Sequence, residues 1–280
     1  MLANFLIVLR EVLEAALIVG IVAAATRGVA ARGRWIGGGI ALGVLGAVLV
    51  AVSAGRLAEA LDGSGQEWFN AGVLLAAVGM IGWHVVWMSK HGRELSQQMQ
   101  AVGRDVSSGA RPMTALMTVI AIAVLREGSE IVLFGYGLMA SGSSVSALAT
   151  GAALGLLCGV GLGFAIYFGL LKIPLRHFFS ATNGLLVFLA AGMAANAAAF
   201  LTQADVLSTW TTPLWNTGWL LGDDSLTGKT VHVLTGYTAE PTGMQLLFYL
   251  STLALLVAGM RLVARHAARA RPTAPSVAAA

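Results

Sequence analysis

Apolar stretches of about 20 residues recur along this chain, and they constrain its fold more than any other feature. A helix of that length spans the ~30 Å hydrocarbon core of a bilayer, because each residue adds 1.5 Å. Charged residues make up only 11% of the 280 residues, whereas soluble domains carry about 25%. The charges that do occur collect between the apolar stretches. The pattern is therefore typical of a polytopic membrane protein, with the lipid bilayer as its surroundings.

We predict seven transmembrane helices and hence an all-α fold. A single transmembrane domain would cover 1–264, with a long outer loop at 202–243 and a disordered cytoplasmic tail at 265–280. The short alternating segments of a membrane β-barrel are absent from the sequence. The predicted helices cover approximately 3–25, 36–56, 69–89, 113–139, 146–171, 178–201 and 244–264.

Almost all lysines and arginines fall on one side of the predicted helices. If the N-terminus is outside, only Arg56 and Lys229 of the 17 lie in outer segments, and Arg10 and Arg126 lie within helices. Cytoplasmic loops carry the excess of basic residues in membrane proteins. We therefore expect a multi-pass protein of the bacterial cytoplasmic (inner) membrane, with its N-terminus outside and its C-terminus cytoplasmic. The net charge of +4 could suggest a nucleic-acid partner, but the basic residues flank helices on one side of the membrane, so we expect none.

The first three helices (repeat one, 1–89) resemble the next three (repeat two, 113–201). Three spans are an odd number, so the second copy would enter the membrane from the opposite side. Inverted repeats of this kind recur in secondary transporters, with the substrate near the midplane. The last helix has no counterpart and is predicted to be appended. The matching positions are Leu9-Arg10-Glu11-x-x-Glu14 with Leu125-Arg126-Glu127-x-x-Glu130, Gly39 and Gly43 with Gly151 and Gly155, and Asn70 with Asn183.

The repeated motif places charged groups inside apolar helices, where each costs roughly 2.5–3.5 kcal/mol. Its two glutamates are three positions apart and lie on one helix face, and the arginine is four positions from the second glutamate. If the repeats pack about a two-fold axis, all four carboxylates face one point. These groups are Arg10, Glu11, Glu14, Arg126, Glu127 and Glu130.

The six groups carry a net charge of −2, which one divalent cation would neutralise. Carboxylate oxygens suit hard cations such as magnesium, calcium, manganese and iron. The alternative is a pair of structural arginine–glutamate clamps joining two helices. A clamp needs one carboxylate for each arginine, and the motif supplies two, so we favour a metal or ion pathway.

Other polar residues are weaker candidates. His84 could be a proton relay or a secondary ligand, although neighbouring tryptophans favour a hydrogen-bonded packing residue near the inner interface. Asn70 and Asn183 are expected to bond between helices or to cap them, and Asn196 could line a pathway. In the outer loop, acidic residues would concentrate cations or are simply solvated charge. The candidates there for receiving a cation from a partner are Asp223, Asp224 and His232.

Arg-Glu-x-x-Glu in the first and fourth of seven helices resembles the high-affinity iron permease family, the oxidase-dependent iron transporters of fungi and bacteria. The outer segment His232-x-Leu234-x-Gly236-Tyr237, followed by Pro241-x-Gly243-Met244-Gln245, is similar to the bacterial ferrous-iron permease branch. The family usually has glycine at the third motif position, which is Gly128 in the second motif but Val12 in the first.

This resemblance implies an iron permease and not an enzyme, with ferrous or ferric iron as the transported substrate and no tightly bound cofactor. Glu11, Glu14, Glu127 and Glu130 would bind the metal, supported by Arg10 and Arg126. Family members work beside an iron-oxidising protein or a periplasmic iron-binding protein at the outer face, so we expect such a partner.

Other functions stay open. The chain could transport another divalent cation, such as manganese or lead, or protons alone, because oxygen ligands select poorly between ions. It could also be a membrane metal sensor or scaffold without transport, and a homo-oligomer is not excluded. An intramembrane protease is disfavoured because His-Glu-x-x-His is absent, and direct use of ATP is disfavoured because there is no Walker-type motif.

Overall fold

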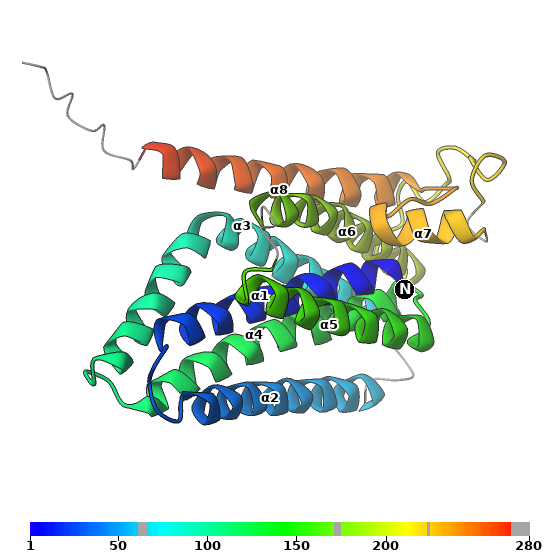
Figure 1. Cartoon of the computed structure of the whole chain (residues 1–280). Helices are drawn as coiled ribbons and strands as arrows, with labels where there is room; N and C mark the ends of the chain where they lie inside the picture. Colours follow the sequence, from blue (N-terminus) through cyan, green and yellow to red (C-terminus); the bar gives the residue numbers. More distant parts are fainter. Residues whose placement is uncertain (61–65, 171–174, 223–224, 270–280) are drawn as a thin grey trace, which may run out of the picture.

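The computed structural model describes residues 1–60, 66–170, 175–222 and 225–269, and within these ranges the chain is helical with no strand (Figure 1). Successive long helices run in opposite directions, and the N-terminus lies at the same end of the bundle as the short helix α7 (Figure 1). The elements are α1 (Leu2–Ala25), α2 (Arg32–Ala60), α3 (Gln66–Ser107), α4 (Met113–Ala140), α5 (Val145–Tyr167), α6 (Leu175–Gln203), α7 (Leu226–Thr235) and α8 (Gly243–Arg269).

Five of these helices are long and apolar enough to cross a membrane. Helices α1 and α4 have 24 and 28 residues, which is also long enough, but each carries the three charged residues of its motif. The chain is therefore a multi-pass membrane protein, and the crossing of α1 and α4 stays a prediction. Large apolar side chains remain exposed on α2, α5 and α8, as expected where lipid replaces water as the solvent. The five apolar segments are Arg32–Arg56, Gln66–Trp87, Val145–Tyr167, His177–Gln203 and Gly243–Val263.

Helix α3 is much longer than predicted. The sequence suggested an end near residue 89, where charged residues begin, but the helix continues to Ser107. Its second half leaves the apolar stretch and packs against the end of α1: a Cβ on Gly103 would lie 2.4 Å from the Cβ of Ala25. The hydroxyl of Ser107 also donates to the carbonyl of Ala25 at 2.9 Å. Hydropathy marks where a helix leaves the bilayer, not where it ends.

The outer loop predicted at 202–243 contains a helix, which the sequence analysis missed. The Ser225 side chain caps the start of α7 by accepting from the Gly228 N–H at 2.8 Å. Gly236 ends it in the left-handed conformation, with φ of 75°. Its Cα lies against Gly192 of α6, so closely that a Cβ on Gly192 would be 2.5 Å away. Helix α7 is thus packed onto the bundle. At the other end of the chain, α8 reaches Arg269 instead of stopping at 264, and 270–280 lie outside the described residues.

Small residues let α1 and α4 sit deep in the bundle. A Cβ on Gly43 of α2 would lie 2.8 Å from the Ala121 carbonyl of α4. A Cβ on Gly155 of α5 would lie 2.7 Å from the Phe5 carbonyl of α1. These glycines and their partners occupy matching positions of the two predicted repeats. The contact of α2 with α4 and the contact of α5 with α1 are therefore equivalent seams.

The same seams explain the unusual Val12. In the second motif, Gly128 faces Ala47, and a Cβ on this glycine would lie 2.6 Å from the Ala47 Cβ. In the first motif the sizes are exchanged: Val12 faces Gly159, where a Cβ would lie 2.7 Å from the valine Cγ1. At this position each seam pairs one glycine with one larger residue. The glycine of the motif therefore serves close helix packing, and α1 is a continuous helix without it.

We expect Gly159→Ala to lower the thermal stability of the purified protein, because overpacking costs about 1–3 kcal/mol. Adding Val12→Gly reproduces the arrangement of the other seam and should recover part of the loss, although glycine inside a helix costs up to ~1 kcal/mol. Gly161→Ala on the same helix is the control, since a Cβ there meets nothing within 4 Å. Equal effects of the two alanine substitutions would contradict this account of the seam.

Candidate metal site

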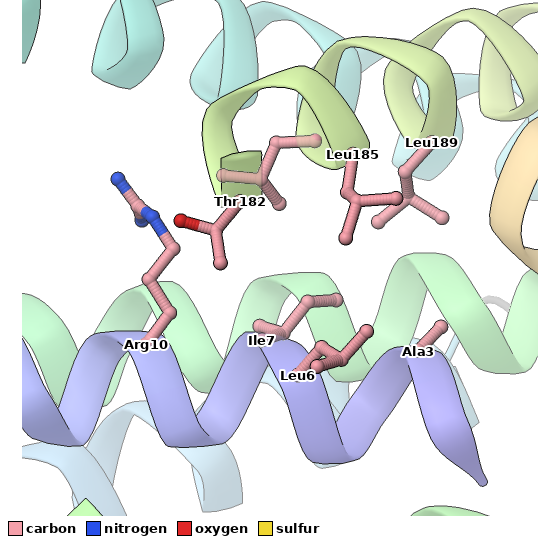
Figure 2. A pocket seen from close by; sticks show the side chains of 8 residues that line it. Ala3, Leu6, Ile7, Arg10, Thr182, Leu185 and Leu189 are labelled. Atoms are coloured by element: carbon pink, nitrogen blue, oxygen red, sulfur yellow. The ribbon is translucent and has the colours of Figure 1, made fainter. Parts of the chain in front are cut away.

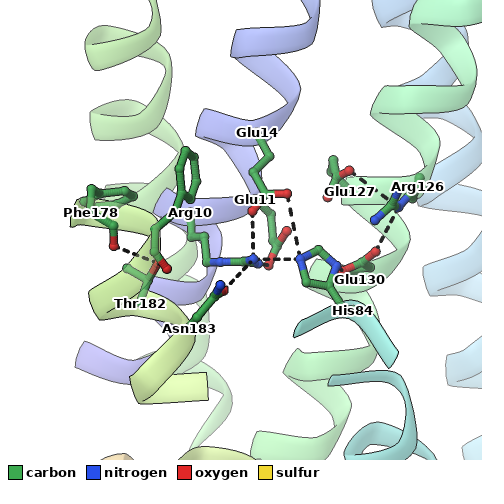
Figure 3. Close-up of polar contacts among 11 residues, drawn as sticks. Arg10, Glu11, Glu14, His84, Arg126, Glu127, Glu130, Phe178, Thr182 and Asn183 are labelled. Atoms are coloured by element: carbon green, nitrogen blue, oxygen red, sulfur yellow. Dashed lines mark hydrogen bonds and ion pairs between the residues drawn. The ribbon is translucent and has the colours of Figure 1, made fainter. Parts of the chain in front are cut away.

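The charged residues of both motifs converge inside the bundle, where α1 and α4 meet α3 and α6 (Figure 3). Motif spacing places these residues on the helix faces opposite the glycine seams. Arg10, Glu11, Glu14, Glu127 and Glu130 are all buried. A charge buried without a partner is very costly, so the contacts among these groups decide whether the arrangement is stable.

Arg10 is the most heavily bonded side chain of the cluster. Its Nη1 lies 2.5 Å from Oε1 of Glu11, and its Nη2 lies 2.8 Å from Oε1 of Glu14. The same Nη2 donates to Oδ1 of Asn183 on α6 at 3.2 Å and lies 2.7 Å from Nε2 of His84 on α3. The predicted bond between residues four apart is confirmed. The predicted interhelical role of Asn183 is confirmed too, and here it fixes the arginine.

Arg126 is held more loosely. Its Nε donates to Oε1 of Glu130 at 3.2 Å and lies 3.6 Å from Oε1 of Glu127. The guanidinium also lies 4.8 Å from the centre of the Trp87 ring, within the range of a cation–π contact. Its side chain is 33% exposed, against 2% for Arg10. The two motifs are thus alike in sequence but unequal in their surroundings.

His84 joins the two motifs, and the sequence analysis underestimated it. Its Nδ1 is in contact with Oε2 of Glu130, and its Nε2 lies 3.8 Å from Oε2 of Glu14. Two neighbouring tryptophans suggested simple packing, but Trp83 is 73% exposed and the Trp87 ring lies against the Arg126 guanidinium. His84 is hydrogen-bonded as expected, but it lies within the charged cluster instead of among packing residues. Helical spacing could have found it, since His84 lies on the same face as the buried Ala77 and Ile81.

Four of these residues could together hold a metal ion. One donor atom from each of Glu11, His84, Glu127 and Glu130 lies within 4.8 Å of all the others. Bonds of about 2.1 Å to carboxylate or imidazole place opposite donors roughly 4.2 Å apart, so small side-chain movements would close the set around an ion. The expectation that four glutamates face one point is thus modified. Glu11, Glu127 and Glu130 bring their oxygens together with His84, whereas Glu14 is not part of this set and lies 3.8 Å from the Nε2 of His84.

Buried carboxylate oxygens without hydrogen bonds make this fit chemically meaningful. Oε2 of Glu11, Glu14 and Glu127 are buried, and no hydrogen-bond partner lies within reach among the described residues. Leaving a buried acceptor unsatisfied costs about 1–3 kcal/mol, and more for a charged group. Such oxygens are available to bind a cation. The residues present therefore fit a hard or borderline metal ion.

The remaining candidates lie apart from this cluster. Asn196 and His232 line a cavity of about 10 Å³ beside α7, together with Ser141 and Met193. The Nδ1 of His232 lies 2.6 Å from the Tyr237 carbonyl. Asp223 and Asp224 fall outside the described residues. The structure thus brings none of the described outer candidates to the glutamates.

A second cavity, of about 20 Å³, extends between α1 and α6 from Ala3 to Arg10 (Figure 2). Its walls are apolar except for Arg10 and Thr182. Leu189 lines both this cavity and the one beside α7, so the two are neighbours. The space is large enough for a water molecule next to the arginine.

Apolar helices around a buried cluster of glutamates and one histidine define an integral membrane protein with a candidate cation site. The chain belongs to the iron permease FTR1 family, which it matches over residues 1–271. The family and the relatives below are permeases, so the protein is a transporter and not an enzyme.

Two relatives illustrate the similarity. The ferrous iron permease EfeU of Escherichia coli O6:H1 is 35% identical over 250 residues, covering 86% of this chain and 88% of the relative. The ferrous iron permease EfeU of Yersinia pestis is 31% identical over 254 residues, covering 89% of each. No solved structure matches the chain.

The unequal burial of the arginines predicts unequal effects on stability. Arg10→Gln should destabilise the detergent-solubilised protein by about 3–5 kcal/mol, because Glu11 and Glu14 lose a buried partner. Arg126→Gln should cost clearly less, since solvent screens a partly exposed charge. Arg111→Gln is the control: its pair with Asp105 is 53% exposed on the arginine side, and such a pair is worth at most ~1 kcal/mol. Thermal or chemical unfolding measures all three, and equal losses for Arg10 and Arg126 would contradict this interpretation.

Proposed function

We propose that this protein carries ferrous or ferric iron across the bacterial cytoplasmic membrane into the cell, through the paired glutamates of its two Arg-Glu-x-x-Glu motifs. The observation that carries the proposal is the convergence of both motifs on one buried cluster with unpaired carboxylate oxygens. Membership of an iron permease family supports iron as the substrate. The names of the E. coli and Yersinia relatives favour the ferrous ion.

Each motif supplies both charge and orientation. Four glutamates and two arginines leave a net charge of −2, so entry of a divalent cation brings the cluster to neutrality. Neutrality matters because an apolar surrounding penalises net charge. Arg10 bonds one oxygen each of Glu11 and Glu14 and leaves the other free. The arginines therefore hold the carboxylates in place without occupying all of their oxygens.

We further propose seven membrane crossings, built from two inverted three-helix repeats and an appended α8. Two features support the repeats: the equivalent glycine seams of α2 on α4 and of α5 on α1, and the alternating helix directions. Inverted repeats often allow alternating access by rocking one repeat against the other around a central site. In that mechanism the cluster between α1 and α4 opens to each side in turn.

The direction of transport follows from the membrane potential. An inside-negative potential of 100 mV favours entry of a divalent cation by roughly 4–5 kcal/mol. The distribution of basic residues supports an N-terminus outside and a C-terminus in the cytoplasm. This topology puts α7 at the outer face, where a periplasmic iron-oxidising or iron-binding protein would dock. We propose such a partner from the family resemblance, and the oligomeric state stays open.

Two alternatives deserve direct tests. Carboxylates also bind manganese and other divalent ions, so the same site could carry those instead of iron. A membrane metal sensor or scaffold would bind the cation in the cluster without moving it across. Flux measurements separate a sensor from a permease, and competing metals separate iron from the other ions.

Glu11→Gln and Glu127→Gln should each abolish most radioactive iron uptake into proteoliposomes that hold the purified protein. Glutamine keeps the size of the side chain but removes the charge and one metal-binding oxygen. Uptake should be measured under ferrous and under ferric conditions, with manganese or zinc as competitors. The preferred ion and oxidation state follow from the same series.

Glu67→Gln is the matched control, because Glu67 lies in the first turn of α3, away from the cluster. This variant should take up iron normally. Normal uptake by both cluster variants would show that the motifs are structural clamps and do not carry the cation. Metal binding without uptake by the wild type would favour the sensor.

The proposed topology can be tested with single cysteines in a Cys158→Ala background. Ser146→Cys, at the start of α5, should react with a membrane-impermeant thiol reagent added outside intact spheroplasts. Ser108→Cys, in the turn between α3 and α4, should react only after permeabilisation. Both serines are exposed, so access to the reagent depends on the side of the membrane. The reverse labelling pattern would show that the orientation is inverted.

A further inference from the structure

We propose that His84 binds the transported cation directly, so that the site consists of three carboxylates and one imidazole and prefers transition-metal ions to magnesium and calcium. This inference rests on the proposed transport function for its cargo, but its main test measures binding alone. The motifs predict only oxygen ligands. The nitrogen comes from α3, which carries neither motif.

The first argument is position. His84 is 2% exposed and lies between the motifs, with its Nδ1 in contact with Oε2 of Glu130. It offers a donor atom within 4.8 Å of those of Glu11 and Glu127. Glu11 is fully buried and its Oε2 has no hydrogen-bond partner among the described residues. A cation among these oxygens would therefore lie next to the imidazole.

The second argument is the surroundings of the ring. Metal-binding histidines usually donate the N–H of their other ring nitrogen to a carboxylate, which fixes the ring and its tautomer. The Nε2 of His84 lies 3.8 Å from Oε2 of Glu14, a buried oxygen without a hydrogen bond. With the ring proton on Nε2, Glu14 can accept it and Nδ1 is free to bind the metal. Since Nη2 of Arg10 can only donate and lies 2.7 Å from this Nε2, the arginine must then give up its contact with the ring, while it keeps its bonds to Glu11, Glu14 and Asn183.

This arrangement also explains the place of Glu14. The motif spacing treats it as equivalent to Glu130, but it is not among the four residues with the closest donor atoms. As the carboxylate behind His84, Glu14 orients the imidazole, whereas Glu130 binds the cation. The two repeats differ here in sequence. The offset that relates Asn70 to Asn183 makes Ala197 the equivalent of His84 in the second repeat. Only one repeat supplies a nitrogen.

The nitrogen has a consequence for selectivity. Carboxylates alone suit magnesium and calcium as well as manganese, whereas imidazole suits iron, zinc, copper and nickel. One imidazole among three carboxylates therefore favours ferrous iron over the far more abundant magnesium. A positioning role predicts otherwise: if His84 only bridges Glu14 and Glu130, no nitrogen contacts the metal.

The test uses Mn²⁺ alone as a paramagnetic probe, bound to the detergent-solubilised full-length protein. Pulsed EPR should detect hyperfine coupling to a directly bound ¹⁴N nucleus, and growth with ¹⁵N-histidine should replace it by the ¹⁵N pattern. The labelled wild type carries no folding risk. His84→Gln should remove the coupling and weaken Mn²⁺ binding by at least ~10-fold, since even indirect partners of metal ligands typically cost 10–100-fold.

His177→Gln is the matched control, because His177 is exposed at the start of α6. This substitution should leave the nitrogen coupling and the Mn²⁺ affinity unchanged. Bound Mn²⁺ without nitrogen coupling, coupling that persists in His84→Gln, or a wild type that does not bind Mn²⁺ would each overturn the proposal. The transport proposal fails separately: nitrogen coupling in a wild type that moves no iron leaves His84 a ligand. Iron uptake by a wild type without coupling removes only His84 from the ligand set.

Discussion

The bonds of Arg10 to Glu11 and Glu14 are the interaction on which the rest of this bundle depends. Carboxylates in an apolar interior are tolerated only when their charge is compensated. Arg10 compensates two of them and also reaches His84 and Asn183, so a single guanidinium connects α1 with α3 and α6. Because a buried arginine satisfies several acceptors at fixed angles, it determines how these helices face one another.

Close packing of α2 and α5 keeps this charged centre away from lipid. Glycines at matching positions bring α2 against α4 and α5 against α1, and the motif faces are left to meet each other. The outer faces of α2 and α5 are correspondingly rich in exposed leucine and valine. The apolar character of these two helices and the polar character of α1 and α4 are thus two parts of one arrangement.

Features that repeat along the chain could be predicted from the sequence. The motif spacing predicted the Arg10–Glu14 and Arg126–Glu130 bonds, since residues four apart share a helix face. Features set by packing between distant segments could not. Trp83 and Trp87 suggested a packing role for His84. The structure instead turns the His84 side chain into the charged cluster, while Trp83 next to it in the sequence is exposed. The second half of α3 carries charges that mark the end of a membrane span, although the chain continues as a helix against Ala25.

The length of α3 lets one helix make two widely separated contacts. Its 42 residues form one helix of roughly 60 Å, and His84 lies near its middle. Beyond the apolar stretch, Gly103 and Ser107 of the same helix pack against the end of α1. Helix α3 curves along its length, so it passes from the charged cluster around to the far end of α1 (Figure 1). One continuous backbone therefore contacts α1 at two distant places, beside its charged motif through His84 and Arg10 and at its last residue, Ala25.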